Sequence, residues 1–217
     1  MTIALIKNLI SGEFENAELI DEFAEEHLKN VEDLWNPLLR TKYFELRQAH
    51  INKYGAINKT VFLSELAEFD VQDAAWNWRN KLEAERGKAL VKSVVMVCNN
   101  QTQGLLMLDS GMHRGRIETQ VDSHLTYIKY IAAAPWNRSK FTNTPNYKYV
   151  GSVLIATAIN NSINEEFEGR IGLHALPQAE QFYEQHCGMT NLGKDPETEG
   201  LVYFEMTAPQ ALKFIRS

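Results

Sequence analysis

The feature that most constrains this chain is a helix that begins beside a Gly-Ser pair and lies between two strand-like segments. Apolar residues around and after Gly151 and Ser152 recur at helical spacing, at Val150, Leu154, Ala158, Ile159 and Ile163. The first amides of such a helix lack partners within it, and the helix dipole makes this end positive. Glycine lets a phosphate group approach the backbone closely, and Lys148 adds a cation beside it. The pattern therefore predicts an anion site at the start of this helix.

The two segments that flank this helix both have the pattern of strands. The run 124–134 is rich in β-branched and aromatic residues and ends at Pro135, which cannot donate to a sheet ladder. In the run 170–176 apolar residues alternate with other residues until Pro177 stops the pattern. Strand, helix and strand make a βαβ unit, so we expect two parallel neighbouring strands joined by a right-handed crossover.

The segments 134–138, 146–152 and 179–189 contain three motifs that resemble those of the GNAT superfamily of acyl-CoA-dependent N-acetyltransferases. The first is similar to the family's hydrophobic-x-Pro-x-x-Arg strand end, and reads Ala134-Pro135-Trp136-Asn137-Arg138. The second resembles its Gln/Arg-x-x-Gly-x-Gly/Ala loop, and reads Asn146-x-x-Tyr149-x-Gly151-Ser152. The third resembles its Ala-x-x-Phe-Tyr-x-x-x-Gly-Phe helix, and reads Ala179-x-x-Phe182-Tyr183 with Gly188-Met189. The resemblance covers roughly residues 124–206.

The motifs depart from the family pattern at four places. Asn146 stands where Gln or Arg is usual, and Tyr149 replaces the first glycine of the loop. Gly188 comes one residue late after Tyr183, and Leu176 stands where many members carry an asparagine. None of these changes removes a main-chain phosphate site, but the side chain of Tyr149 is expected to point away from the phosphates.

The resemblance implies an α/β (α+β) fold with a mixed, mostly antiparallel sheet around a central parallel βαβ unit and helices on both faces. We expect a single GNAT-like domain over residues 1–217, because no linker rich in proline or glycine divides the chain. Residues 1–86 are expected to be an enlarged, mainly helical portion that forms the acceptor side. Residues 87–217 are expected to hold the sheet core and the acetyl-CoA site.

Individual elements are also predicted from the residue pattern. In the first portion we expect a strand at 2–10 and helices at 16–30, at 31–54 with a bend or break at Pro37, and at 60–86 with an interruption near Asp70. Two apolar runs, 89–98 and 104–109, around a polar loop at 99–103 predict a hairpin. A last strand is expected at 201–206, and the irregular segment 111–122 falls where the acceptor enters.

By resemblance, the chain is expected to transfer an acetyl group directly from acetyl-CoA (coenzyme A) to an amine. An alternative hypothesis is a non-catalytic acyl-CoA-binding or protein-interaction module that keeps the fold. The cofactor is expected to meet backbone groups of the strand, the start of the helix and nearby cations, namely Ile131, Ala132, Ala133, Arg138, Lys148, Tyr149, Val150, Gly151 and Ser152.

Amine acetylation needs a deprotonated nucleophile, a polarised carbonyl and a proton for the departing thiolate. Tyr183 matches the family's tyrosine and is the predicted acid; without the resemblance it reads as a core tyrosine with a surface hydroxyl. The candidate bases are Glu118, before the cofactor strand, and His174, on the strand after the helix. An acceptor amine with a low pKa needs no dedicated base.

Composition limits the partners. The net charge of −6 argues against broad nucleic-acid binding, and no apolar run reaches membrane-span length, so neither nucleic acid nor membrane is expected. We expect a cytoplasmic location, because no signal peptide is evident. Cys98 and Cys187 form no Cys-x-x-Cys pair, so no metal site is predicted. The acidic run 13–33 is either a solvated helix face or a lining for a cationic small-molecule or peptide amine.

Overall fold

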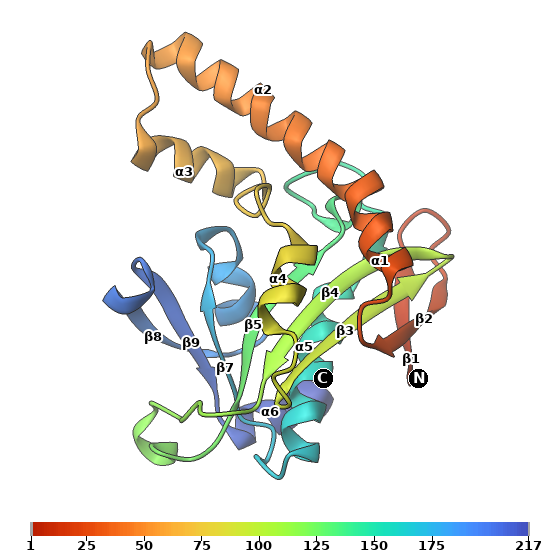
Figure 1. The fold of residues 1–217 in the computed structure, drawn as a ribbon, viewed down its shortest axis with the longest axis vertical. Helices are drawn as coiled ribbons and strands as arrows, with labels where there is room; N and C mark the ends of the chain where they lie inside the picture. Colours follow the sequence, from red (N-terminus) through yellow and green to blue (C-terminus); the bar gives the residue numbers. More distant parts are fainter. Residues whose placement is uncertain (1, 217) are drawn as a thin grey trace.

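The computed structural model describes residues 2–216, and a nine-stranded sheet forms its centre (Figure 1). The strand order is β6-β1-β2-β3-β4-β5-β7-β9-β8, and β5 and β7 pair in parallel while all other neighbours are antiparallel. This arrangement confirms the predicted mixed sheet with a central parallel unit. The strands are β1 (Thr2–Asn8), β2 (Phe14–Asp21), β3 (Val91–Cys98), β4 (Gln101–Asp109), β5 (Thr126–Ala133), β6 (Tyr147–Lys148), β7 (Ile171–Ala175), β8 (Thr190–Asp195) and β9 (Leu201–Met206).

Helices cover the two faces of the sheet unequally. On one face α5 (Val150–Asn164) and α6 (Ala208–Arg216) pack on a core that includes strands from both ends of the sheet. On the other face α1 (Glu25–Asn30) and α4 (Trp78–Glu85) cover a second core built on β3, β4 and β5 (Figure 1). Successive residues of β4 from Leu105 to Leu108 are buried alternately in the second and first core, which explains the continuous apolar run of this strand.

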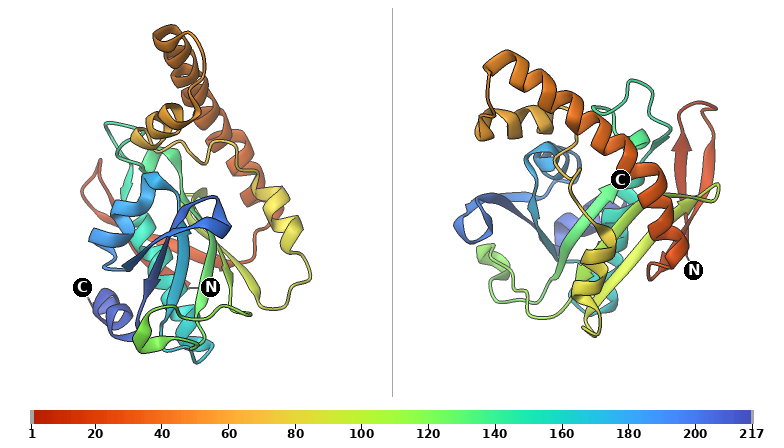
Figure 2. Two further views of the ribbon diagram at one scale, coloured as in Figure 1. Left: turned by 90° about the vertical axis from the view of Figure 1, so that its left-hand side faces the viewer. Right: turned by 45° about the horizontal axis from the view of Figure 1, so that its top comes forward.

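Two helices form an arm that extends from the body of the protein (Figures 1 and 2). The arm consists of α2 (Asn36–Tyr54) and α3 (Lys59–Glu68). His50 ties them together, because its Nδ1 lies 2.6 Å from Oε2 of Glu65 while its Nε2 accepts the backbone N–H of Asn58. Residues 69–77 then return to the sheet and lead into α4, so the helix predicted at 60–86 is interrupted at the expected place.

The helix predicted at 16–30 is wrong for its first part. Residues Phe14–Asp21 form β2, and the helix begins only at Glu25. The segment pairs with β1 along one edge and β3 along the other, so a complete set of ladder hydrogen bonds outweighs its helical spacing. The strand predicted at 2–10 ends at Asn8, where the chain turns into this hairpin.

A π turn precedes Pro37 instead of a break. Residues Val31–Trp35 connect α1 to α2 in π geometry, and the backbone N–H of Asn36 donates to the carbonyl of Val31. Proline has no N–H and crowds the carbonyl of the preceding turn, so a wide turn at this place accommodates the ring without ending the helix.

The β3–β4 hairpin has a shorter loop than the predicted residues 99–103. Only Asn99 and Asn100 connect the strands, and both have positive φ, 51° and 59°. Asparagine tolerates this left-handed conformation better than most residues, and two such residues make the tight turn whose twist matches that of the strands.

Strands β5 and β7 separate soon after they begin. They pair only at their first three positions, the last being Ile128 with Leu173. On its other edge β5 carries a bulge at Lys129, because Met107 pairs with Tyr130 and Leu108 with Ile128. Beyond this point the edge of β5 that faces β7 has no strand partner, and a wedge opens between the two strands. None of the helices within residues 2–216 is both long and apolar enough to cross a membrane.

Candidate active site

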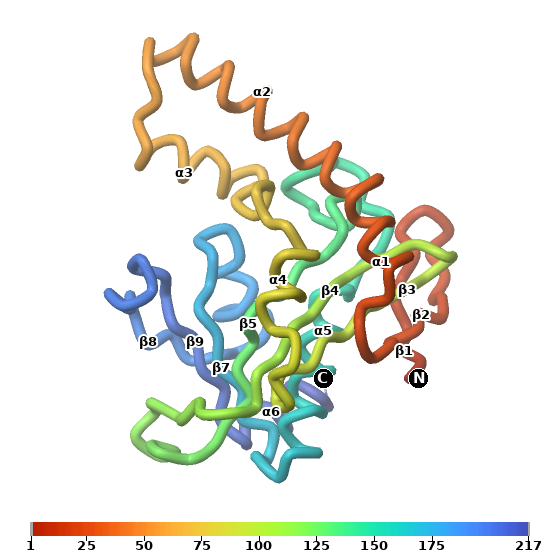
Figure 3. Tube along the Cα trace, viewed as in Figure 1, coloured from red at the N-terminus to blue at the C-terminus, as the bar shows by residue number. Residues whose placement is uncertain are grey.

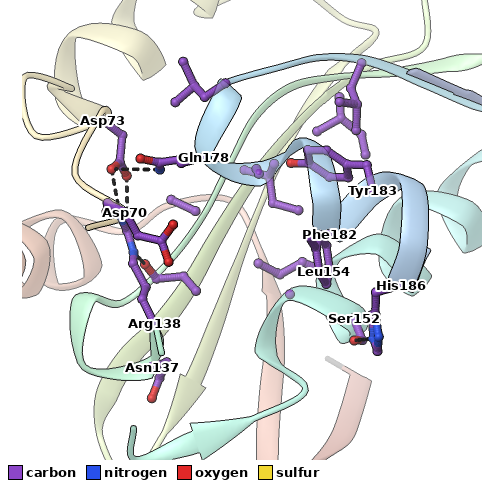
Figure 4. A pocket seen from close by; sticks show the side chains of 18 of the residues that line it. Asp70, Asp73, Asn137, Arg138, Ser152, Leu154, Gln178, Phe182, Tyr183 and His186 are labelled. Carbon is purple, nitrogen blue, oxygen red and sulfur yellow. Dashed lines mark hydrogen bonds and ion pairs between the residues drawn. The ribbon is translucent and has the colours of Figure 1, made fainter. Parts of the chain in front are cut away.

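A cleft of about 930 Å³ occupies the wedge between β5 and β7 (Figure 4). One wall is β5 from Tyr127 to Ala133, the base is the start of α5, and the opposite wall is the segment 176–186 that follows β7. The predicted backbone contacts Ile131, Ala132 and Ala133 therefore all line the cleft. Because β7 has moved away from them, alternate residues of this stretch present N–H and C=O groups that an extended ligand can pair with.

Tyr149 occupies a strained position directly before α5. Its φ of 78° and ψ of 2° are left-handed, a conformation that glycine adopts freely and tyrosine rarely does. This explains why the resembling family has glycine here. The ring stacks on Phe14 with centroids 6.3 Å apart and planes 3° from parallel, so it is directed to the β1–β2 hairpin and not over the first amides of α5.

The start of α5 forms the base of the cleft and is partly covered by the segment after β7. Gly151 lies under Phe182, since an added Cβ would come 3.1 Å from the end of that ring. Ser152 Oγ lies 2.9 Å from Nε2 of His186, which stacks on Phe182. Val150 is buried in the core, so only its backbone is available to a ligand. Lys148, Gly151 and Ser152 line the cleft as predicted for a phosphate site.

The guanidinium of Arg138 makes its hydrogen bonds with other groups of the protein. Its two terminal nitrogens each donate to a carboxylate oxygen of Asp73 at 2.7 Å, and its Nε donates to the carbonyl of Ala133 at 2.9 Å. One of them also donates to the carbonyl of Asp70, and only 9% of the residue is exposed. This buried ion pair joins the end of β5 to the segment before α4. Arg138 therefore holds the wall of the cleft. The other lysines that line the cleft are Lys129, which pairs with Glu85, and Lys140 and Lys148.

The two sides of the cleft are bridged by a reciprocal pair of glutamines, which we call the clasp. The backbone N–H of Gln72 donates to Oε1 of Gln178 at 2.7 Å, and the backbone N–H of Gln178 donates to Oε1 of Gln72 at 3.0 Å. Lys140 Nζ donates to the carbonyl of Gln178 at 3.3 Å. Nε2 of Gln178 also donates to Oδ1 of Asp73 at 3.5 Å (Figure 4). The clasp fixes the segment after β7 to the portion of the chain before α4.

Tyr183 lies in a π turn that explains its unusual spacing from Gly188. The π turn spans Phe182–His186, and the backbone N–H of Cys187 donates to the carbonyl of Phe182 at 3.0 Å. A π turn holds one residue more than an α turn, so it absorbs the extra residue seen in the sequence. The ring of Tyr183 packs against Phe204, and its hydroxyl points into the cleft (Figure 4). Burial raises the pKa of Tyr183, which keeps the hydroxyl protonated at neutral pH.

His174 connects three strands through a line of hydrogen bonds. Its Nδ1 lies 2.7 Å from the hydroxyl of Tyr127 on β5, and its Nε2 lies 3.0 Å from Oδ2 of Asp195 on β8. Asp195 also accepts from Arg116 at 2.7 Å. The pKa of the Asp195 carboxyl is held below its usual range, first by Arg116 and then by His174. Tyr127 and His174 both line the cleft.

Glu118 lies away from this site. It is exposed in a short 3₁₀ helix, Glu118–Gln120, and is not among the residues that line the cleft. The connection from β4 to β5 that carries this helix is the green loop at the lower left of Figure 3. Of the two candidate bases the structure therefore brings only His174 to the site of Tyr183. The acidic run 13–33 likewise contributes no residue to the cleft, and Glu25 and Glu32 pair with Arg79.

Three residues of the cleft region were missed by sequence reasoning. Tyr127 reads only as a strand-forming residue, and Asp195 lies in a strand, β8, that the pattern did not reveal. Asp70 lines the cleft with a φ of 53°, and burial raises the pKa of its carboxyl. The break between two helical runs was the one signal that pointed to Asp70.

Neither a comparison with models of protein families nor one with curated proteins gives a match. Among solved structures, a protein assigned to the GNAT family of acetyltransferases, from Desulfovibrio desulfuricans, has a TM-score of 0.50 at 10% identity, covering 87% of this chain and 96% of that chain. The PaiA N-acetyltransferase of Thermoplasma acidophilum, crystallised with coenzyme A, has a TM-score of 0.48 at 11% identity, covering 88% and 98%.

A third structure, from Bacillus anthracis and assigned as a streptothricin acetyltransferase with acetyl coenzyme A, has a TM-score of 0.42 at 17% identity. Its alignment covers 57% of this chain and 66% of that one. The chain has the GNAT fold, which confirms the resemblance in its motifs at the level of the fold.

Proposed function

We propose that this chain is an N-acetyltransferase of the GNAT superfamily that moves an acetyl group from acetyl-CoA to an amine by direct transfer. The observation that carries the proposal is the cleft itself. An unpaired strand edge, a helix start and a buried tyrosine hydroxyl converge on one elongated space of about 930 Å³. That is the arrangement that a long thioester with a phosphate-bearing end requires.

We assign the cofactor to three parts of the cleft. The pyrophosphate lies at the first amides of α5, at Val150, Gly151 and Ser152, with Lys148 beside them. The pantetheine arm runs along the unpaired edge of β5 and pairs with backbone groups of residues 131–133. The thioester then lies near the bulge at Lys129. Tyr149 contributes backbone only, because its ring stacks on Phe14.

The cleft supplies the groups that acetyl transfer needs. The amine nitrogen attacks the thioester carbon, a carbon–nitrogen bond forms, and the carbon–sulfur bond breaks. Tyr183 gives its proton to the departing thiolate, since its hydroxyl is protonated and directed into the cleft. His174 is the preferred base over Glu118, because it lines the cleft and Glu118 does not.

The acceptor is an amine on a small molecule or a peptide. The carboxylates that line the cleft are Asp70 and Asp73, and both lie beside cations of the protein, Lys140 and Arg138. A cationic acceptor thus has little free negative charge to meet here, which favours an acceptor with one amine over a polyamine. The cytoplasmic location expected from the sequence stays a prediction.

The proposal is tested by a thiol-release assay with acetyl-CoA and grouped amine acceptors, run beside calorimetry of acetyl-CoA binding. We expect binding by the wild type, and turnover with at least one class of amine. Gly151→Glu places a charged side chain against Phe182 and the phosphate site, and is expected to lose binding. Tyr183→Phe is expected to keep binding and lose turnover.

Two outcomes would contradict the proposal. Acetyl-CoA binding without turnover across all amine classes would identify a non-catalytic acyl-CoA-binding module. Absence of binding by a folded wild-type chain would favour a protein-interaction module that keeps the fold.

A further inference from the structure

We infer that Tyr127, His174 and Asp195 form a proton relay in which the hydroxyl of Tyr127 removes the proton from the acceptor amine. The inference rests on the proposed acetyl transfer and assigns it a base that contacts the amine. His174 then acts behind Tyr127, and Asp195 positions His174. The three residues come from three different strands, β5, β7 and β8, and meet on the sheet face opposite α5.

The protonation states of Tyr127, His174 and Asp195 follow from the hydrogen bonds that join them. Asp195 also accepts from Arg116, and the pKa of its carboxyl lies below the usual range, so the carboxylate is ionised and can only accept. Nε2 of His174 must therefore carry the proton that Asp195 accepts at 3.0 Å. Nδ1 is then free to accept from the hydroxyl of Tyr127 at 2.7 Å. The imidazole thus presents its basic nitrogen to the phenol.

The position of Tyr127 suits contact with the acceptor. It lies two residues before the bulge at Lys129, where the thioester is expected, and it is opposite Gly172 in the parallel pair. Tyr127 and its neighbour Tyr130 both line the cleft, so the phenol lies along the path to the reacting carbon. His174 also lines the cleft, and its Nδ1 lies 2.7 Å from the phenol oxygen, so the phenol has a direct acceptor for its proton.

The other groups around the relay hold it in place. The ring of His113 stacks on Tyr127 at 4.4 Å, and the ring of Tyr203 on β9 lies 4.9 Å from that of His174. Arg116 lies 4.1 Å above the ring of Tyr203 while it binds Asp195. Glu205 accepts the backbone N–H groups of Arg116 and Ile117, which fixes the segment that carries this arginine.

The relay balances protons over one turnover. As the amine nitrogen bonds to the carbonyl carbon, its proton moves to the oxygen of Tyr127 and the phenol proton moves to Nδ1 of His174. The resulting imidazolium is stabilised by the Asp195 carboxylate. Tyr183 protonates the thiolate, and solvent returns one proton from His174 to Tyr183. Burial raises the pKa of Tyr127, so the phenol stays neutral unless His174 takes its proton as the amine gives one up.

The alternative is that the line is only a structural link between strands. Tyr127→Phe, His174→Gln and Asp195→Asn separate the two cases, with Tyr43→Phe in the arm as the matched control, because it removes a phenol hydroxyl that does not line the cleft. The relay predicts that kcat falls about 100-fold for Tyr127→Phe and His174→Gln. Asp195→Asn lowers kcat less, and Tyr43→Phe leaves it unchanged. Calorimetric Kd values for acetyl-CoA stay at the wild-type value throughout.

The pH profile of kcat gives a readout that a structural link would not change. An imidazole that already carries two protons can accept none, so the wild-type kcat falls on the acidic side. Tyr127→Phe and His174→Gln should lose this limb while remaining folded by circular dichroism. Equal kcat values with the acidic limb retained in both variants would overturn the relay and leave acetyl transfer intact. A wild type that binds acetyl-CoA but acetylates no amine would overturn both.

Discussion

The two faces of strands β5 and β7 differ sharply, although neighbouring residues of the same strands build them. Ile128 and Leu173 face α5 and are 2% and 1% exposed, deep in the first core. Tyr127 and His174, one position earlier and one later, face the opposite side and form polar contacts along the cleft. The alternation of a strand thus assigns stability to one face and chemistry to the other.

Helix coverage explains why the second face is available for chemistry. The second core covers β3, β4 and the later part of β5, and includes no residue of β7 or β9. On β7 and β9 the residues of this face are Gly172, His174, Tyr203 and Glu205, which make polar contacts or leave room for them. A helix here would bury the groups that the proposed reaction needs.

The largest expected effect is a loss of stability when a core residue on the α5 face is truncated. Leu173→Ala removes a fully buried side chain and should lower the free energy of unfolding by about 2–5 kcal/mol. Urea denaturation followed by circular dichroism measures it. The matched change on the other face, Tyr127→Phe, removes one hydrogen bond. It should lower the free energy of unfolding by only about 0.5–1.5 kcal/mol. Equal losses for both variants would contradict the division between the faces.

The next effect is a loss of catalytic rate without a loss of stability. Tyr183→Phe removes the proposed acid and should lower kcat about 100-fold, as expected for loss of a general acid. The hydroxyl points into the cleft, so its loss should change the melting temperature little. Thiol release measures kcat, and differential scanning calorimetry on the same sample measures the melting temperature. A large drop in melting temperature with unchanged kcat would make Tyr183 a core residue.

A smaller effect is expected at Tyr149. Tyr149→Gly relieves a left-handed tyrosine, worth about 1–2 kcal/mol, and loses the stack on Phe14, worth about 0.5–1.5 kcal/mol. The free energy of unfolding should therefore change by less than about 1 kcal/mol, and the Kd for acetyl-CoA should stay within about threefold. Calorimetry measures the Kd. A tenfold loss of affinity would mean that the tyrosine ring itself contacts the cofactor.

The smallest effect uses Cys187 as a reporter of the α5 face. Burial raises the pKa of this thiol from 9.0 to about 12, so at pH 8 its thiolate fraction is on the order of 10⁻⁴. Iodoacetamide should alkylate it only when the protein unfolds. Because the folded protein holds this thiol proton more tightly than the unfolded chain does, Cys187 adds to the free energy of unfolding. This contribution is complete below pH 9 and is lost as pH rises toward about 12. Rapid alkylation of the native protein would contradict this burial.

The sequence predicted the parts of the fold that local patterns govern. The βαβ unit, the hairpin and the helix break near Asp70 all follow from spacing and from proline or glycine positions. The error at 16–30 arose because β2 has helical apolar spacing, and only its two partner strands decide its conformation. The helix α6 was not predicted, although its apolar residues Ala208, Ala211, Leu212 and Ile215 recur at helical spacing. The strand β8 gave no clear local pattern.

The site was predicted less completely, since its contacts join distant segments. The motif identified Tyr183 and the start of α5, but the partner of Arg138 is Asp73, 65 residues away. Likewise, His174 was a candidate by residue type, whereas its partners Tyr127 and Asp195 are apparent only once three strands are aligned.

The π turn at Phe182–His186 has a consequence for the descent of this chain. An inserted residue normally rotates everything after it around the helix axis by about 100°. Here the extra residue is confined to one wide turn that contains Tyr183, so Gly188 after the turn keeps its place relative to the tyrosine. Deletion of Gln185 should therefore still allow the chain to fold. By the same reasoning, a residue can be gained in this wall of the cleft without moving Tyr183, the proposed acid.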